Sequence, residues 1–309
     1  LEFAQGGILR DIPGLDPGTL GWIFLLLIAG LGVKAALVPL HGWLPRAMVA
    51  PAPVSALLHA VAVVKAGAFG IIRVVYDVYE YAGFLGLLPV LGVVAAVTII
   101  YGSVKALSQD YLKKRLAYST VSQVAYIALG TTILGPLATI GGVVHLVHQG
   151  LMKITLFFAA GNYAETLGIH KVSDMDGVGR RMPGTTLAFS IGALGMIGVP
   201  PVAGFVTKWY LGLGAVEAGV AAWVLPVLIV SSLLNAAYFL PILYRAWFKE
   251  APKDHPAAEA MPGRRETSGA LLWPPVVTAV LALAAGLFAA APYSPLEWAE
   301  LIAAREYRQ

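Results

Sequence analysis

The chain has no cysteine among its 309 residues, and only 12% of its residues are charged. Without cysteine it offers no thiolate for an iron–sulfur cluster, no disulfide and no thiol nucleophile. A soluble domain of this length would be about 25% charged. The shortage of charge, together with 58% hydrophobic residues and a mean hydropathy of +0.77, indicates a polytopic membrane protein.

The sequence also lacks the patterns that would place a cofactor. It has no P-loop and no HExxH motif, and neither His41 nor His255 has companions at metal-ligand spacing. We therefore predict no metal, no cofactor and no catalytic centre on this chain. The pI of about 9.2 comes from basic residues in loops, so no nucleic-acid partner is expected.

Eight apolar runs are close to the length that a membrane-spanning helix needs. They lie at 20–44, 53–72, 84–104, 116–133, 137–160, 185–212, 221–244 and 270–291. The sequence thus predicts an all-α polytopic membrane protein with about eight transmembrane helices. Residues 1–19 are expected to be an extramembrane lead-in, 20–291 the transmembrane domain and 292–309 a C-terminal tail.

Two of these runs combine internal proline with a lysine and are expected to be broken helices. They are the runs 20–44, with Lys34 and Pro39, and 185–212, with Pro200, Pro201 and Lys208. A membrane tolerates such breaks only where protein or water satisfies the freed backbone groups. The paired breaks hint at an internal inverted repeat, although the sequence identity between the two runs is weak.

Basic residues are distributed unevenly between alternate loops. The loops 45–52, 105–115, 161–184 and 245–269 hold 13 Lys and Arg residues, whereas the opposite side holds four. The positive-inside rule therefore predicts that the richer side is cytoplasmic and that both termini lie outside.

Lys34 and Lys65 lie deep inside their apolar runs. A lysine at the centre of a membrane helix costs about 3 kcal/mol on insertion scales. Snorkelling to the interface is the alternative, but Lys34 lies about ten residues from the end of its run at Leu44, and Lys65 lies about twelve residues from the start of its own run. We favour a proton-transfer role for both. His59, which precedes Lys65 by six residues, is predicted to be a proton relay rather than a hydrogen-bonded core histidine, because imidazole titrates near neutral pH.

Polar residues also align on the run 137–160. His145, Gln149 and Lys153 are spaced i, i+4, i+8 and share one helix face, with His148 at its edge. This alignment predicts a hydrated path with Lys153 as the central proton carrier and both histidines as proton-transfer groups. Gln149 does not titrate and is expected to orient water.

Two further features have alternative interpretations. Lys208 is either a lysine near a helix end beside interfacial Trp209 or an intramembrane functional group. A second polar face on the run 116–133 either bonds neighbouring helices or holds water between the regions of two lysines, and the sequence leaves both open. This face consists of Ser119, Ser122, Gln123 and Tyr126.

Several motifs together resemble one protein family over about residues 30–245. They read PLHGWLPRAM, APAPVSALLHA, VKAG, DYLKKRLAYSTVSQ, HLVHQGLMKITLFFAAG and IGVPPVAGFVTKW. The chain resembles the antiporter-like proton-channel subunits of respiratory complex I, which share a family with Mrp-type cation/proton antiporters and membrane-bound hydrogenases. The resemblance implies an inverted-repeat antiporter-like fold and the same orientation as the charge distribution.

The resemblance also implies roles for particular residues. It gives Lys34 the role of a proton-switching lysine with a glutamate partner, and it makes Lys208 the end of the proton path. Family members often have histidine where this chain has Gln149, and His148 is the residue that can replace it. Such proteins usually have about fourteen helices, and the motif at Lys34 belongs to the seventh. The predicted spans hold no Asp or Glu. Either the chain is part of a longer protein, which we favour, or a partner supplies the carboxylate.

Three functions are open to a chain of this kind. The first is a proton-translocating subunit coupled to electron transfer in a partner module, as in NADH–quinone oxidoreductase or a membrane hydrogenase. The alternative is a subunit of an Mrp-type Na⁺ or K⁺/H⁺ antiporter. An inert scaffold is disfavoured because it would not need four costly intramembrane lysines. The expected partners are other membrane subunits, and the expected location is a bacterial or archaeal cytoplasmic membrane.

Overall fold

The computed structural model describes residues 16–79, 86–252 and 266–307, and helices dominate all three parts. The α-helices are α1 (Pro17–Ala35), α2 (Trp43–Arg46), α3 (Ala52–Ala56), α4 (Val63–Arg73), α5 (Leu88–Leu107), α6 (Leu112–Ile133), α7 (Pro136–Leu167), α8 (Val178–Arg181), α9 (Pro183–Ile197), α10 (Ala203–Glu217), α11 (Ala221–Phe248), α12 (Gly269–Leu287) and α13 (Pro295–Tyr307). Tighter or wider helical turns lie at η1 (Leu40–Gly42), η2 (Ala47–Val49), η3 (Leu57–Val61), η4 (Val74–Val78) and η5 (Val172–Asp174). The expected all-α membrane fold is confirmed.

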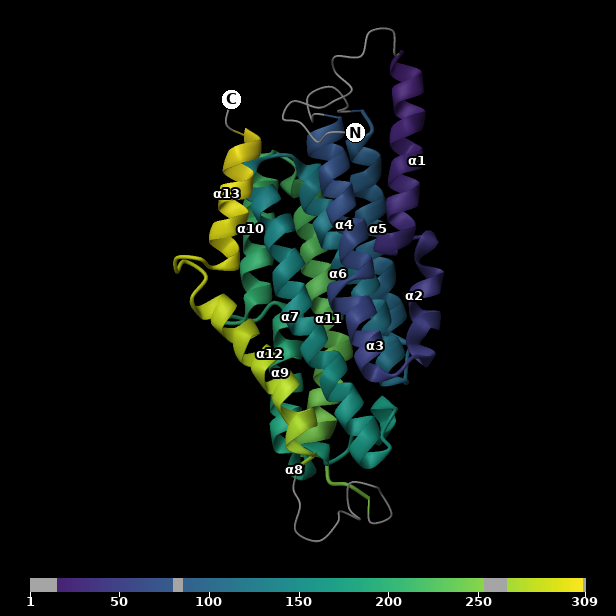
Figure 1. The fold of residues 1–309 in the computed structure, drawn as a ribbon, viewed down its shortest axis with the longest axis vertical. Coiled ribbons are helices and arrows are strands. Elements are labelled where there is room, and N and C mark those ends of the chain that lie inside the picture. Colours follow the sequence, from purple (N-terminus) through teal and green to yellow (C-terminus); the bar gives the residue numbers. More distant parts are fainter. Residues whose placement is uncertain (1–15, 80–85, 253–265, 308–309) are drawn as a thin grey trace.

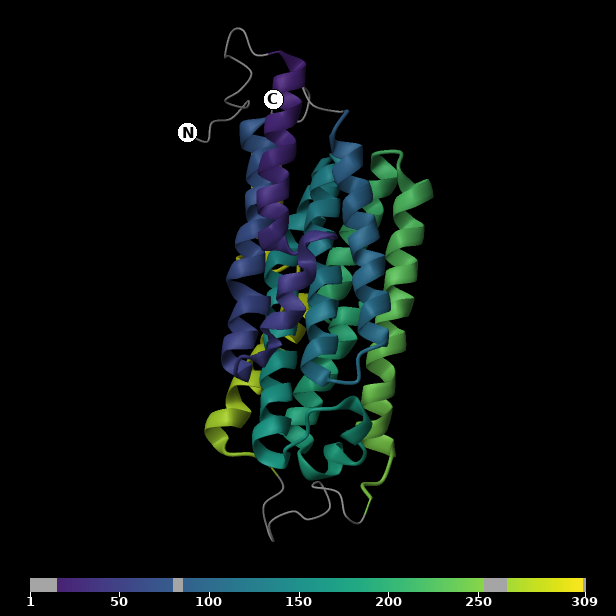
Figure 2. The same cartoon turned by 90° about the vertical axis from the view of Figure 1, so that its right-hand side faces the viewer.

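The 32-residue helix α7 is the central element of the bundle. It packs against α3, α6, α9, α10, α12 and α13. In Figure 1, α1 lies at one edge of the bundle, while α12 and α13 lie at the opposite edge. Figure 2 shows α11, in green, along a further edge. Because these helices cover one face of α7, the side chains of His145, His148, Gln149 and Lys153 are shielded from lipid.

The first expected break is present. Helix α1 ends at Ala35, since Ala36 adopts a left-handed conformation (φ 56°) and Pro39 has no N–H to continue the helix. The chain then continues through short helical turns as far as Val49, beyond the expected end at Leu44.

The second expected break is present as well. Helix α9 ends at Ile197, where Gly198 takes a positive φ of 94° that suits a residue without a Cβ. Pro200 and Pro201 follow, and α10 begins at Ala203. The break therefore leaves the last carbonyl groups of α9 without helical partners.

The expected span 53–72 is longer and less regular than predicted. It includes the π-helical turn η3, a kink at Ala62 and a second π-helical turn that carries it to Val78. Asp77 therefore lies in this segment, only 8% exposed, and forms a 3.0 Å ion pair with Arg73. The expectation that no acidic residue lies within a span was wrong here, because the helix continues past its predicted end.

Six described helical segments are long and apolar enough to cross a membrane. Of the other two predicted spans, one corresponds to α6, which is more polar, and the other is divided into the 15-residue helices α9 and α10. Helix α7 also runs past its expected end and includes the exposed Glu165.

The polar residues of α6 and α7 lie where two apolar clusters meet. One cluster joins α1, α4 and α5 to the C-terminal half of α6. The other joins the N-terminal end of α6 to the C-terminal half of α7, α9 and part of α11. These residues therefore form a polar layer near the middle of α6 and α7, with a close-packed apolar cluster on either side.

Three of the cation-rich loops meet at one end of the bundle. Tyr111 pairs with Lys171 in an isolated β-bridge, and Arg245 forms a 3.1 Å ion pair with Asp176. The beginning of α1 and the end of α13 both lie at the opposite end (Figure 1). Residues expected to form a C-terminal tail instead form α13, which packs against α7. Residues 1–15 of the expected lead-in lie outside the described residues.

Candidate functional site

Lys153 is fully buried near the middle of α7. Its Nζ donates a 2.7 Å hydrogen bond to the Ser119 hydroxyl on α6 and lies 5.9 Å from the ring centre of Phe239 on α11. Among the described residues, no carboxylate forms an ion pair with it. A hydroxyl and an aromatic face therefore provide the surroundings of a charge whose burial is costly.

A chain of hydroxyl groups leads away from Lys153. The hydroxyls of Ser119 and Tyr238 are 2.9 Å apart, and the Tyr238 O–H donates to Oδ1 of Asn235 at 2.6 Å. Because Tyr238 has one hydroxyl hydrogen, Ser119 supplies the hydrogen between the two hydroxyls when Tyr238 donates to the amide. Asn235 Nδ2 in turn donates to the Met196 carbonyl at 3.0 Å. The path from α7 thus reaches the second helix break.

Lys208 meets the same break from α10. Its Nζ donates to the Ile197 carbonyl at 2.6 Å, to the Met196 carbonyl at 3.4 Å and to the Ser232 hydroxyl at 2.8 Å. These carbonyl groups are acceptors because α9 ends there. The networks of Lys153 and Lys208 therefore share the Met196 carbonyl. Asn235 does not titrate near neutral pH, so a proton crossing this point needs water.

A second connection begins at Lys65. This residue is 8% exposed, and its Nζ lies 3.5 Å from the backbone carbonyl of His145, within hydrogen-bonding distance. The His145 ring packs on Tyr126 with a centroid separation of 5.4 Å, and Lys208 Nζ lies 5.7 Å from the centre of the same tyrosine ring. Tyr126 therefore lies between the first histidine of α7 and the lysine of α10.

The other two predicted histidines are also buried. His59, in η3, packs against Phe157 of α7 with a centroid separation of 4.9 Å, one turn beyond Lys153. Nδ1 of His148 lies 3.3 Å from the Thr207 hydroxyl on α10. The π-helical turn thus places His59 against α7, although the sequence predicted a regular helix there.

Many buried polar atoms in this layer make no hydrogen bond to the described residues. They are both ring nitrogens of His59 and His145, Nε2 of His148, both amide atoms of Gln149, Nε2 of Gln123 and the hydroxyl of Tyr126. Buried polar groups are normally satisfied by protein or by ordered water. They are concentrated in one layer, where the hydrated path expected from the sequence stays a prediction. The last predicted lining residue, Ser122, bonds Ser103 of α5 at 2.9 Å.

Lys34 is not part of this network. It lies in the last turn of α1, on an exposed face, while the next residue, Ala35, is buried against α4. A Cβ placed on Gly67 would lie 2.4 Å from the Ala35 backbone nitrogen, so the two helices are in close contact. Only the buried face of α1 meets the bundle, and Lys34 is on the other face.

Sequence reasoning missed the polar residues of α11. Asn235 and Tyr238 are fully buried, and Ser232 bonds Lys208. A signal was available, because Ser231, Ser232, Asn235 and Tyr238 recur at spacings of three and four in a long apolar run. Their partners on α6 and α10, however, were not apparent from that spacing.

A helical bundle with two broken helices and a buried row of lysines and histidines defines an antiporter-like membrane protein. The chain belongs to the family described as "NADH:quinone oxidoreductase/Mrp antiporter, TM", whose model matches residues 13–234. The resemblance stated from the motifs is thereby confirmed.

The similarity extends over most of the chain. NADH-quinone oxidoreductase subunit N of Desulforudis audaxviator is 43% identical over 285 residues, which cover 89% of this chain and 56% of that protein. Hydrogenase-4 component B of Escherichia coli is 36% identical over 68% of this chain and 32% of its own length. A chain of the Mrp complex from Dietzia superposes with a TM-score of 0.82 at 26% identity, covering 94% of this chain and 60% of that one. The chain thus spans about half the length, or less, of the curated relatives it matches.

Proposed function

We propose that this chain conducts protons across the membrane as a subunit of a larger assembly. The observation that carries the proposal is the buried polar layer, which links Lys153 to the Lys208 break through bonded side chains. Lys65 and His145 extend the layer on the other side. Lysines and imidazoles gain and lose protons, while the hydroxyls and water carry them between these groups.

The coupling to electron transfer is inferred from the relatives. The D. audaxviator relative is named as a subunit of NADH-quinone oxidoreductase, and the E. coli relative as a hydrogenase component. We infer that a partner module transfers electrons and that its energy changes the protonation of the lysine row. Such coupled groups titrate together rather than one at a time.

Cation/proton antiport is the second candidate function. The superposition on the Mrp complex chain supports it. Na⁺ or K⁺ binding needs several oxygen ligands, and the polar layer presents mainly nitrogen groups and hydroxyls. In that case the proton row would be the same, and the cation ligands would belong to another subunit.

The partners and location follow from the same reasoning. The chain is an integral membrane protein, and its structural neighbours come from multi-subunit membrane complexes. We propose a bacterial or archaeal cytoplasmic membrane, with the cation-rich end inside and both termini outside. The exposed Lys34 would then receive its carboxylate partner from outside the described residues.

One experiment distinguishes the two modes of coupling. Inverted vesicles containing the native assembly are followed with a pH-sensitive dye, first with an electron donor and then with a Na⁺ or K⁺ pulse. Acidification with the electron donor alone is expected for the redox-coupled subunit. A pH change driven by the cation without electron flow would replace that function with antiport, and the absence of both signals would contradict proton conduction.

Tyr238→Phe should slow proton uptake about tenfold, the factor that 1.4 kcal/mol produces in a rate. The substitution removes the hydroxyl that joins Ser119 to Asn235, while the ring keeps its contact with Phe239. The dye assay measures the rate. Tyr244→Phe is the control, since Tyr244 lies exposed on the same helix. Equal rates for the two variants would exclude the Tyr238 hydroxyl from the path.

A further inference from the structure

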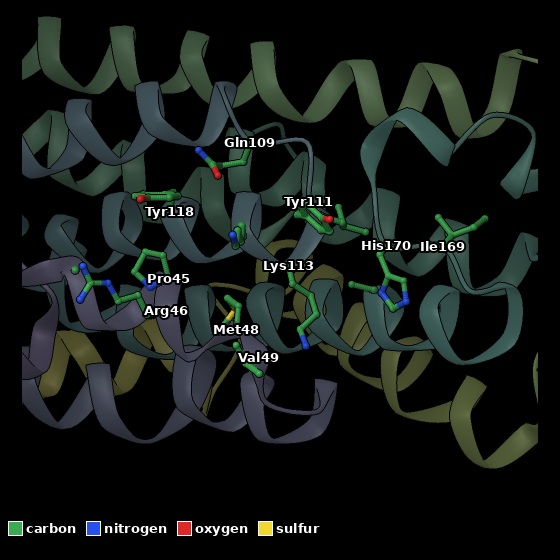
Figure 3. Close-up of a pocket in the computed structure, with 14 residues that line it drawn as sticks. Pro45, Arg46, Met48, Val49, Gln109, Tyr111, Lys113, Tyr118, Ile169 and His170 are labelled. Atoms are coloured by element: carbon green, nitrogen blue, oxygen red, sulfur yellow. The ribbon is translucent and has the colours of Figure 1, made fainter.

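A basic pocket lies at the cation-rich end of the bundle, away from the proton row. Its volume is about 630 Å³, and it is formed by the segment after the first break, the beginning of α6 and the turn after α7. Arg46 and His170 lie toward opposite ends of this pocket, with Lys113 between them (Figure 3). Lys114 also contributes to its lining.

The cations of this pocket are not neutralised by the described protein. Arg46, Lys113 and Lys114 form no ion pair within the described ranges, although Arg180 at the same end pairs with Glu250 at 3.3 Å. Asp110, the acidic residue of the adjoining loop, is held by the backbone N–H and hydroxyl of Ser173. The pocket therefore presents uncompensated positive charge.

Lys113 retains the capacity to bind an anion. Its Nζ donates one hydrogen bond, to the Ala50 carbonyl at 2.5 Å, and an ammonium group has three donors. The adjacent Lys114 lies over the ring of the exposed Tyr111, with its Nζ 5.5 Å from the ring centre. These two lysines come from the first turn of α6 and Arg46 comes from the segment after the first break, so an anion bound by all three would join the two elements.

The basic pocket continues into an apolar cavity. A second cavity of about 530 Å³ shares Val49, Lys113 and His170 with it and is otherwise lined largely by apolar groups, among them Phe158 and Leu271. Glu165 also lines this second cavity, but the basic pocket has no acidic residue in its lining. A charged pocket that opens into an apolar groove fits a molecule with an anionic head and a hydrocarbon tail.

We propose that this double cavity binds an anionic phospholipid, with its phosphate at Arg46, Lys113 and Lys114 and an acyl chain along Phe158 and Leu271. The shared chemistry is a phosphate ester, and the apolar continuation favours the lipid over a soluble phosphate. A lipid is also the anion that surrounds an integral membrane protein at high local concentration, and basic pockets between transmembrane helices bind such head groups. The bound lipid fastens the segment after the first break to α6.

The test compares lipids retained by the native assembly purified in non-ionic detergent, using native mass spectrometry with phosphatidylglycerol and phosphatidylcholine. The unaltered assembly is expected to retain phosphatidylglycerol preferentially. The double variant Lys113→Gln/Lys114→Gln should weaken that retention roughly twenty-five-fold, at about fivefold for each cation near a head group. The matched control Arg180→Gln/Lys249→Gln removes two cations that are paired with Glu250 and Asp176, and it should leave retention unchanged.

Two further measurements distinguish a bound lipid from a bound soluble phosphate. Leu271→Gln, at a partly exposed position, should reduce phosphatidylglycerol retention, and millimolar glycerol 3-phosphate should not displace the lipid. Complete displacement by glycerol 3-phosphate, with no effect of Leu271→Gln, would make the pocket a soluble-phosphate site and overturn the lipid proposal. Equal retention of phosphatidylglycerol and phosphatidylcholine by the unaltered assembly would by itself overturn the lipid proposal.

Discussion

Lys153→Ala should abolish proton uptake by the assembly, reducing the rate by about a hundredfold or more, the range for loss of a proton-transferring group. Lys153 is the titratable residue that begins the bonded path to the second break. Ser119 and Tyr238 remain in the variant, but neither takes up a full proton near neutral pH. The measurement is dye-reported acidification of inverted vesicles at matched protein content.

Assembly should survive this substitution, because the variant removes a buried charge rather than an ion pair. Lys153→Met keeps the aliphatic stem beside Phe239 and should be equally inactive, which separates lost proton transfer from a packing cavity. Lys105→Ala is the matched control, since Lys105 is exposed near the end of α5. Normal uptake by both Lys153 variants would refute the central role of this lysine.

Gly204→Ala should destabilise the second break and lower proton uptake together. A Cβ at Gly204 would lie 1.9 Å from the Gly195 carbonyl oxygen and 3.2 Å from Met152 Sδ. The backbone of α9 or α10 must then shift, at a cost typical of overpacking, about 1–3 kcal/mol. Lys208 is one helical turn further along α10, so its contacts with Met196 and Ile197 move with the helix.

The thermal unfolding midpoint of the purified assembly measures the destabilisation, and the dye assay measures uptake. Gly30→Ala is the control, because Gly30 is also helical but a Cβ there would meet no atom within 4 Å. We expect the control to unfold at the original temperature or slightly above it, since alanine is the better helix former. An unchanged midpoint for Gly204→Ala would contradict the close contact between α9 and α10.

The arrangement of the polar layer fits both a stable membrane bundle and the proposed path for protons. Leu116 and Val121 belong to different apolar clusters, yet each lies within three residues of Ser119, a polar member of the layer. Close-packed apolar side chains on either side of the layer hold the helices together. The layer itself contains buried polar atoms that have no hydrogen-bond partner among the described residues. We propose that protons move along this layer, from Lys65 toward Lys208.

The sequence alone determined the class of the protein and predicted most members of the candidate site. Sparse charge and eight apolar runs predicted a helical membrane protein, because such runs satisfy their backbone groups only as helices in lipid. Proline beside Lys34 and Lys208 predicted both breaks. The i, i+4, i+8 spacing of His145, Gln149 and Lys153 identified one polar face, since this periodicity is local to a helix.

Only the tertiary structure decided which polar groups meet. Residues far apart in the chain, such as Ser119, Lys153 and Tyr238, come together through the packing of α6, α7 and α11, and helical periodicity carries no information on such contacts. The same packing leaves Lys34 exposed and buries Lys153, although both occupy apolar runs. Local sequence determines which face of a helix is polar, but the neighbouring helices determine what that face touches.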